Sequence, residues 1–381
     1  MAKPEIRLKG FKGEWENKLL GNLCSVNRGV RVTRKELNNQ GDYPVFQNTD
    51  YPMGFYNQYN VAGNNPFVII GGSAGLIGFS KKEFWAADDC VFFGDNAELD
   101  KAYLFNILLK HSSTIKKNVR GSSVPRLDRK VLVGLSISIP SIDEQQGIAD
   151  YFKSLDSMIQ GVTKKIASLK QMKQACLVSM FPQVGETKPR VRFKGFKGEW
   201  GKNKAGNLFM TFNERNRPDL PVLSANQDIR GMAPRTDTGY NISHNKANEV
   251  TYKVVKPGQY VIHLRSFQGG FAHSSVEGIT SPAYTVFGFK DAERHDDYFW
   301  KIIFMSKEFI KSLETITYGI RDGRSISFSE FAEMNFYFPS KEEQQQIASF
   351  FTSLDKQISL QEARLEKLKQ IKAACLDKMF V

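Results

Sequence analysis

The fold is decided by a stretch that occurs twice, as PSIDEQQGIA at residues 140–149 and as PSKEEQQQIA at residues 339–348. The repeat extends further, because the strings SLD, CL and MF that follow the first copy return 199 residues later. Each copy places Ser-x-x-Glu directly after a proline, which is the capping-box pattern of a helix N-terminus. The sequence therefore predicts two long helices, within residues 141–182 and 340–381.

Both predicted helices carry apolar residues at heptad spacing, which predicts a coiled coil. The apolar positions of the first copy are Ile148, Phe152, Leu155, Ile159, Val162, Ile166 and Leu169. Lys173 and Lys372 interrupt the pattern at equivalent places. Each is either a device that fixes the register or a lysine whose charged end reaches solvent at a frayed seam. We expect the two helices to pair with each other, antiparallel; two separate hairpins, each packed on its own domain, are the alternative.

A second repeat precedes each helix, because GFKGEW occurs at residues 10–15 and again at residues 195–200. The chain thus alternates two variable domains with two repeated helices. The expected order is a first domain at residues 1–140, a helix at 141–182, a linker and second domain at 183–339, and a helix at 340–381. With 381 residues and 41% hydrophobic residues, the chain can bury a core in each domain.

Each variable segment mixes strand-like and helical stretches. Strands are expected at residues 68–70, 131–139, 259–264, 284–289 and 336–338, which are rich in β-branched and aromatic residues. Helices are expected at 100–110 and 296–313. Each variable segment therefore predicts a globular domain of α and β structure.

The chain carries a net charge of +13, spread as +6 and +5 over the variable segments and +1 over each helix. A diffuse positive field favours a polyanionic partner, most often a nucleic acid. No apolar run has the length of a membrane span, and the N-terminus lacks an apolar signal region. The four cysteines form no CxxC pair, so a reduced, cytoplasmic protein is expected.

Glycine loops rich in arginine follow both predicted domain helices, at residues 120–126 and 318–325. Arginine suits phosphates, and arginine and serine also suit base edges, so equivalent loops in both copies favour contact with nucleic acid. The alternative for each loop is a solvated basic surface.

The sequence contains no catalytic constellation. Residues 71–75 match G-x-S-x-G, but the following residues are not helical and the second copy has no equivalent serine, so a glycine-rich turn is expected. Residues 64–67 depart from the Asn-Pro-Pro-Tyr/Phe signature of adenine methyltransferases, since Asn65 stands at the first proline. The five histidines show no metal spacing.

In its two repeated helices and two variable domains, the whole chain resembles the specificity subunits of type I restriction–modification enzymes. The Pro-x-x-x-Glu-Gln-x-x-Ile element ahead of a long helix, present from Pro140 and from Pro339, carries the resemblance. It implies an α+β fold, in which two globular α/β target recognition domains are separated by two long antiparallel coiled-coil helices with pseudo-twofold symmetry.

The resemblance also implies a division of labour. Each recognition domain would read one half of a bipartite double-stranded DNA target, and the helices would set the spacing and dock two modification subunits. This chain would be non-catalytic and bind no cofactor or metal. S-adenosylmethionine would belong to the modification subunits, which methylate adenine at N6, and ATP and Mg to restriction subunits, the translocase and nuclease of the endonuclease complex.

Candidate DNA contacts are polar and basic residues near the loops of each domain. In the first domain they are Arg28, Arg31, Gln47, Asn48, Ser73, Lys81, Arg120, Ser122, Ser123 and Arg126. In the second domain they are Arg215, Asn226, Arg230, Arg265, Gln268, Arg321, Arg324 and Ser325. For partner docking, the candidates are Gln145, Gln146, Gln344 and Gln345, which are otherwise simple helix-start residues.

Two other classes of protein remain open. One is a DNA-bridging or regulatory protein that binds specifically without a modification partner. The other is a coiled-coil scaffold whose charge is incidental, and it would bind DNA weakly and without sequence preference.

Overall fold

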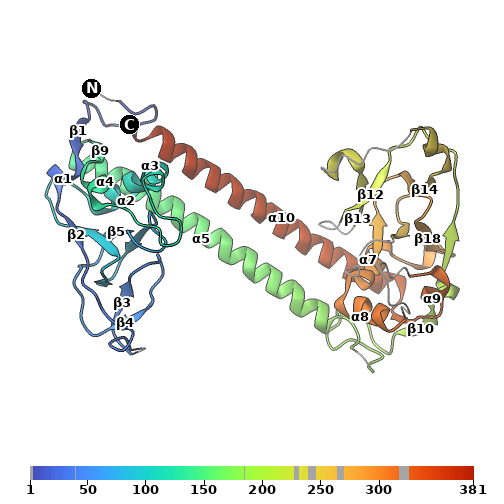
Figure 1. Ribbon diagram of the computed structural model, residues 1–381. Helices are drawn as coiled ribbons and strands as arrows, with labels where there is room; N and C mark the ends of the chain where they lie inside the picture. The colour runs from blue at the N-terminus through green and yellow to red at the C-terminus, as the bar shows by residue number, and fades with distance from the viewer. Residues whose placement is uncertain are drawn as a thin grey trace. The chain divides into compact units, whose positions relative to one another are not determined.

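The computed structural model describes residues 3–38, 40–183, 185–226, 231–238, 246–263, 270–316 and 326–381. The chain divides into two compact units. Unit 1 contains residues 1–165 and 361–381, and unit 2 contains residues 166–360. The boundaries fall within the long helices α5 (Ile142–Ser179) and α10 (Lys341–Lys378), so each unit includes the start of one helix and the end of the other (Figure 1).

In unit 1, the described strands form short sheets. One sheet has the strand order β2-β8-β5-β6, another has β4-β3-β7, and β1 pairs with β9. The strands are β1 (Glu16–Leu19), β2 (Val26–Arg28), β3 (Tyr43–Phe46), β4 (Gly54–Tyr56), β5 (Asn65–Ile69), β6 (Ile77–Ser80), β7 (Trp85–Ala86), β8 (Cys90–Phe93) and β9 (Ser136–Ile139). The helices are α1 (Leu20–Leu23), α2 (Lys101–Lys110), α3 (Ser112–Lys117) and α4 (Arg129–Val133).

In unit 2, the main sheet has the strand order β11-β18-β15-β16-β13-β12, while β10 pairs with β19 and β14 with β17. The strands are β10 (Gly201–Lys204), β11 (Phe209–Phe212), β12 (Leu223–Asn226), β13 (Gly231–Pro234), β14 (Lys253–Val255), β15 (Tyr260–Ile262), β16 (Phe271–Ser274), β17 (Gly278–Thr280), β18 (Thr285–Phe289) and β19 (Asn335–Phe338). The helices are α6 (Ala205–Leu208), η1 (Arg235–Thr238), η2 (Lys246–Thr251), η3 (Ala292–Arg294), α7 (Asp297–Met305), α8 (Lys307–Ile316) and α9 (Phe328–Ala332).

Two sequence expectations about these elements are wrong in part. Residues 131–139 are not one strand, because α4 and the turn at Gly134 precede β9. Residues 296–313 are not one helix, because Ser306 adopts an extended conformation between α7 and α8. Both stretches are apolar enough for either structure, so hydrophobicity alone does not place the breaks.

The core of each unit includes the far end of the helix that began in the other unit. In unit 1, the Phe380 ring lies 5.4 Å from Tyr103 and 5.7 Å from Phe152, measured between ring centroids. Unit 2 repeats the arrangement with Phe181, whose ring stacks on Phe299 at 5.7 Å. Aromatic rings that pack into a core bury large apolar areas, so these contacts fasten each helix end to its domain.

The long helices pair antiparallel within each unit. In unit 1, Tyr151 contacts Cys375 and Asp156 contacts Lys372, so residue numbers rise along α5 while they fall along α10. In unit 2, Leu169 packs with Leu354 and Ile358. The expected antiparallel pairing is therefore confirmed.

Candidate nucleic-acid interface

Four segments that are distant in the sequence of unit 1 meet at one surface, which we call the loop surface. They are residues 47–48, 71–75, 88–89 and 120–126. The main-chain hydrogen bonds that join them are Ser73 N to Asn48 O at 3.2 Å, Gly72 N to Pro125 O at 3.1 Å and Ile70 N to Asp89 O at 2.8 Å. Because these bonds involve the backbone, the segments hold their side chains on a fixed frame.

Residues 120–126 form a narrow hairpin loop. Arg120 and Arg126 exchange main-chain hydrogen bonds of 2.8 and 2.7 Å, and Gly121 turns the chain at φ +91°. Ser122 and Ser123 are exposed at the tip. The loop therefore presents two arginines at its base and two hydroxyl groups between them.

Asp89 organises the charges of the loop surface. Its Oδ1 accepts a hydrogen bond of 2.6 Å from Nη1 of Arg126 and lies 4.0 Å from Nη2 of Arg28. The Asp89 side chain is 17% exposed, whereas the Arg126 and Arg28 side chains are 57% and 53% exposed. The carboxylate is thus mostly buried, while the guanidinium groups face solvent.

Asp88 contacts Arg28 as well, and it contacts one further candidate, Gln47. Its carbonyl accepts a 2.5 Å hydrogen bond from Nε of Arg28, and its Oδ1 lies 3.4 Å from Nε2 of Gln47. Asn48 and Ser73 are exposed next to them. An array of arginine, glutamine, asparagine and serine side chains offers donors for phosphates and for base edges.

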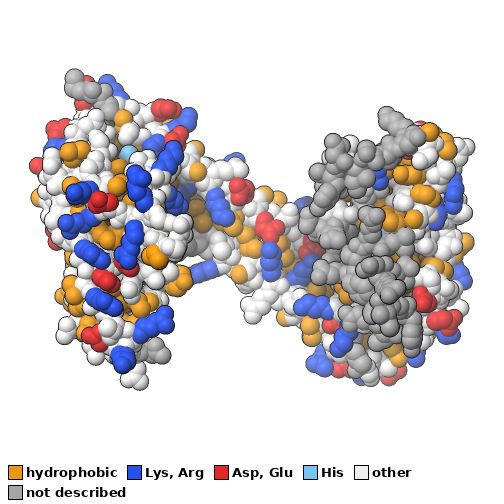
Figure 2. All heavy atoms as spheres, viewed as in Figure 1, with side chains coloured by type: hydrophobic (Ala, Val, Ile, Leu, Met, Phe, Trp, Pro, Cys, Tyr) orange, Lys and Arg blue, Asp and Glu red, His pale blue; other side chains and the backbone are white. Residues whose placement is uncertain are grey.

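The structure therefore brings together eight of the ten candidates in unit 1. Seven belong to the loop surface: Gln47, Asn48, Ser73, Arg120, Ser122, Ser123 and Arg126. Arg28, at the end of β2, joins them through its contacts with Asp88 and Asp89. Arg31 and Lys81 are also exposed, but no hydrogen bond or ion pair of the described residues joins them to the loop surface. Figure 2 shows Lys and Arg side chains distributed over the visible face of unit 1.

In unit 2, most candidates lie outside the described residues: Arg230, Arg265, Gln268, Arg321, Arg324 and Ser325. Arg215 is exposed and donates a hydrogen bond from Nε to Oδ1 of Asn213 at 3.1 Å. Asn226 ends β12 and pairs with Gly231 of β13.

The glutamines at the helix starts divide into two kinds. Gln145 and Gln344 are buried, and each receives a main-chain N–H at its Oε1, from Asp100 at 2.9 Å and from Asp296 at 3.0 Å. These hydrogen bonds join the starts of α2 and α7 to α5 and α10. The expectation that Gln145 and Gln344 lie on an outward face is therefore wrong. Gln146 and Gln345 are exposed.

The glutamates of the same motif bind arginines. Both carboxylate oxygens of Glu144 accept hydrogen bonds from Arg7 at 2.7 Å, and both oxygens of Glu343 accept from Arg192 at 2.8 and 2.6 Å. The expected capping box is therefore not their role. The two pairs instead join the segment at the beginning of each domain, which contains Arg7 or Arg192, to the start of α5 or α10.

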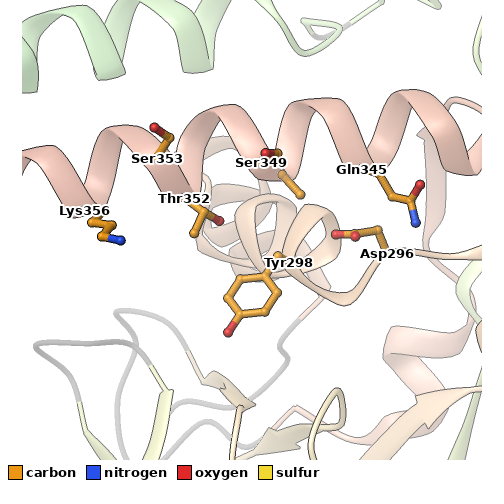
Figure 3. Close-up of a pocket in the computed structure, with 8 residues that line it drawn as sticks. Asp296, Tyr298, Gln345, Ser349, Thr352, Ser353 and Lys356 are labelled. Atoms are coloured by element: carbon orange, nitrogen blue, oxygen red, sulfur yellow. The ribbon is translucent and has the colours of Figure 1, made fainter.

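A groove of about 600 Å³ lies in unit 2 between α10 and the start of α7 (Figure 3). Asp296 and Tyr298 line one side, and α10 contributes Gln345, Thr352 and Lys356 to the other. Burial raises the pKa of Asp296 above its ordinary value. Two of the equivalent positions of α5 carry charged residues, Asp150 and Lys153, where α10 has uncharged residues.

The described part of the chain offers no group of three or more His, Cys, Asp or Glu that could hold a metal ion. Ser73 lies in a turn that leads into β6, as expected for a glycine-rich turn. Asn65 is buried in β5, where its amide donates to the carbonyl of Phe93 at 3.1 Å. Of the described helices, none is both long and apolar enough to span a membrane.

The sequence did not indicate a role for Asp89 or for Gly71, which lies against the Asp89 side chain. Paired aspartates are common in turns, so Asp88-Asp89 gave no distinctive signal. A Cβ on Gly71 would lie 2.4 Å from Cγ of Asp89, so only glycine fits there without a shift. The partnership depends on contacts between segments 18 residues apart, which no local pattern encodes.

Comparisons with known proteins agree with this architecture. A family model described as the type I restriction modification DNA specificity domain matches residues 12–171 and 198–370. The specificity subunit of the type I restriction enzyme MjaVIII of Methanocaldococcus jannaschii is 23% identical over 394 residues, covering 94% of this chain and 90% of that one. The MpnII specificity subunit of Mycoplasma pneumoniae is 24% identical over 169 residues, which cover 42% of this chain and 51% of that one.

Matches to the Mycoplasma pneumoniae relatives are partial, and the chain spans about half the length of two of them. Among solved structures, the S subunit of a type I restriction–modification system from M. genitalium has a TM-score of 0.68 at 16% identity, covering 100% of this chain and 99% of that one. That likeness shows a shared fold. Because the family model matches both halves of the chain, this protein belongs to the type I restriction–modification DNA specificity family.

Proposed function

We propose that this chain is the DNA-recognition subunit of a type I restriction–modification complex in which each unit reads one half of a bipartite target. The loop surface of unit 1 carries this proposal. It gathers arginine, glutamine, asparagine and serine side chains from segments distant in sequence onto one rigid frame. Such groups bind phosphates and read base edges in the major groove.

The long helices are proposed to set the distance between the half-sites. An α-helix rises about 1.5 Å per residue, so 38 residues extend about 57 Å. Half-sites one helical turn apart, about 34 Å, present the same face of the duplex. A paired helix fixes a separation better than a flexible linker does, because a linker samples many lengths.

The exposed faces of the helices are proposed to dock two modification subunits. Gln146 and Gln345 are exposed near the helix starts, and the groove beside Gln345 offers further polar groups. The modification subunits would supply S-adenosylmethionine and methylate adenine at N6, a reaction that requires the base to leave the stack. Restriction subunits would supply ATP- and Mg-dependent cleavage, so this chain would contribute recognition rather than catalysis.

Mapping N6-methyladenine across the genome of a host with and without this gene, with the methyltransferase subunit present, tests the proposal. We expect methylation at one split motif, two short elements around a fixed unspecified gap, to disappear on deletion. An unchanged methylome would overturn the modification role. In that case, specific binding of the purified chain to DNA would favour a bridging or regulatory protein that acts without a modification partner.

A further inference from the structure

We propose that Asp89 is a specificity-determining residue of unit 1, which positions Arg126 for base readout and suppresses the binding of Arg126 and Arg28 to arbitrary DNA. The inference rests on the proposed function, since it assigns a role within the same surface. Asp89 would not itself contact DNA.

The geometry gives Asp89 a supporting position. Its carboxylate is mostly covered, and the two arginines beside it, Arg126 at hydrogen-bond distance and Arg28 at 4.0 Å, are more than half exposed. Arg126 gives one Nη1–H to Asp89 at 2.6 Å, which leaves the rest of its five-donor fork unengaged by that bond. A guanidinium held in this way loses less rotational freedom when it forms a two-pronged contact with guanine O6 and N7.

The frame around the carboxylate is rigid. The Asp89 carbonyl accepts from Ile70 N at 2.8 Å, and Leu127 N donates to the Ile70 carbonyl at 2.9 Å, so the strand end, Asp89 and the arginine loop form one hydrogen-bonded unit. Gly71 leaves the space in which the carboxylate lies. The side chain can therefore direct Arg126 without being displaced by the neighbouring backbone.

The charge of Asp89 acts in the opposite sense on unspecific binding. Phosphates attract free arginines without regard to sequence, and a carboxylate beside two arginines offsets part of that attraction. Removing the carboxylate therefore has two effects of opposite sign. Sequence-specific binding weakens because Arg126 loses its orientation, while unspecific binding strengthens because a negative charge is gone.

The test is selection of bound duplexes from a library of randomised double-stranded DNA by the full-length chain, followed by sequencing. For Asp89→Ala, we expect base preference to fall about tenfold at one or more positions of one half-site, as for the loss of a two-pronged base contact. The other half-site serves as an internal control and keeps its preference. Binding to a duplex that lacks the motif should rise about two- to fivefold at low salt.

Two further variants show whether the effect of Asp89→Ala comes from the orientation of Arg126, from a folding defect or from the loss of a negative charge. Asp89→Asn keeps an oxygen that accepts from Arg126, so it should retain more base preference than Asp89→Ala. Asp50→Asn removes an exposed negative charge two residues after Asn48, and among the ion pairs of the described residues Asp50 has no arginine partner. It should leave both half-sites unchanged.

The outcomes distinguish this inference from the proposed function. If the wild-type chain selects no motif, the proposed function fails, and the inference fails with it. If the wild type selects a split motif and Asp89→Ala selects the same motif with equal preference in both halves, the role of Asp89 is overturned while the function stands. Loss of both halves in Asp89→Ala and in Asp89→Asn also overturns it, because a positioning residue of unit 1 acts on one half only.

Discussion

Lys372 on α10 and Asp156 on α5 form an ion pair, with 2.5 Å between Nζ and Oδ1, and Lys173 and Asp355 repeat it at 2.5 Å. The lysines are the interruptions of the heptad pattern, and the aspartates belong to the repeated Ser-Leu-Asp motif. Each lysine of the seam therefore has an acidic partner on the facing helix in its own unit. This favours a role in fixing the register over simple solvation of a frayed seam.

A double-mutant cycle on the first pair measures this role. Lys372→Met and Asp156→Asn should each lower the free energy of unfolding, and the coupling between them should be about 0.5–1 kcal/mol, the range for partly exposed pairs. Urea denaturation at low and high salt provides the measurement, and the coupling should shrink with salt. A coupling of zero at both salt concentrations would remove the register role.

The Arg7–Glu144 pair is expected to stabilise unit 1 more strongly. Glu144 is 1% exposed, so Arg7→Ala leaves a buried carboxylate without its partner and should cost roughly 2–3 kcal/mol. Arg7→Ala combined with Glu144→Gln should cost less than Arg7→Ala alone, because no charge is then buried. The matched control is Arg190→Ala, whose side chain is 64% exposed and should cost under about 0.5 kcal/mol. Equal losses for both arginines, measured by urea titration, would contradict this account.

Arg126 and Lys81 provide a matched comparison for DNA recognition. Both are exposed and basic, but only Arg126 belongs to the loop surface. Arg126→Ala should lower specific affinity by about 1–3 kcal/mol and relax one half-site, whereas Lys81→Ala should leave the motif unchanged. Binding measured with duplexes substituted one base pair at a time provides the test. A relaxed motif in Lys81→Ala with none in Arg126→Ala would place the interface elsewhere.

Two glycines should respond oppositely to alanine. Gly71→Ala places a methyl group 2.4 Å from Cγ of Asp89, so it should destabilise the protein by about 1–3 kcal/mol. Gly161 lies exposed within α5, where an added Cβ meets nothing within 4 Å. Gly161→Ala should stabilise by about 0.5–1 kcal/mol, because glycine is a poor helix former. Thermal unfolding of both variants checks the two signs together, and a stabilised Gly71→Ala would contradict the packing described at Asp89.

His295 should make unit 2 less stable at mildly acidic pH. Burial lowers the pKa of His295, whose ring stacks on Phe289 at 4.8 Å. Below about pH 6.5, the unfolded chain binds the proton more readily than the folded chain does, so the free energy of unfolding decreases as the pH is lowered. The decrease is at most about 1.4 kcal/mol per pH unit for one proton. His295→Phe keeps an aromatic ring and should make the loss between pH 7.5 and 5.5 shallower. Part of the loss should remain in this variant, because burial also lowers the pKa of His111 and His263. A variant that loses as much stability as the wild type over this pH range would exclude His295 as a source of the loss.

The repeated architecture could be predicted from the sequence because it is written twice. Heptad spacing and the 199-residue repeat depend on local order, and the structure confirms two paired helices and mixed α and β units. Gln145 shows where such reasoning ends. Its motif is obvious in the sequence, but its burial against Asp100 follows from packing between distant segments. The loop surface has the same limit, because Arg126 could be chosen from its loop but its partner Asp89 could not.

The most direct test of the central claim is a methylome after replacement of residues 1–140 by the first variable domain of a different specificity subunit. If each unit reads one half of the target, one element of the split motif should change, while the other element and the gap between them stay the same. Two changed elements, or a motif that does not change, would contradict the account.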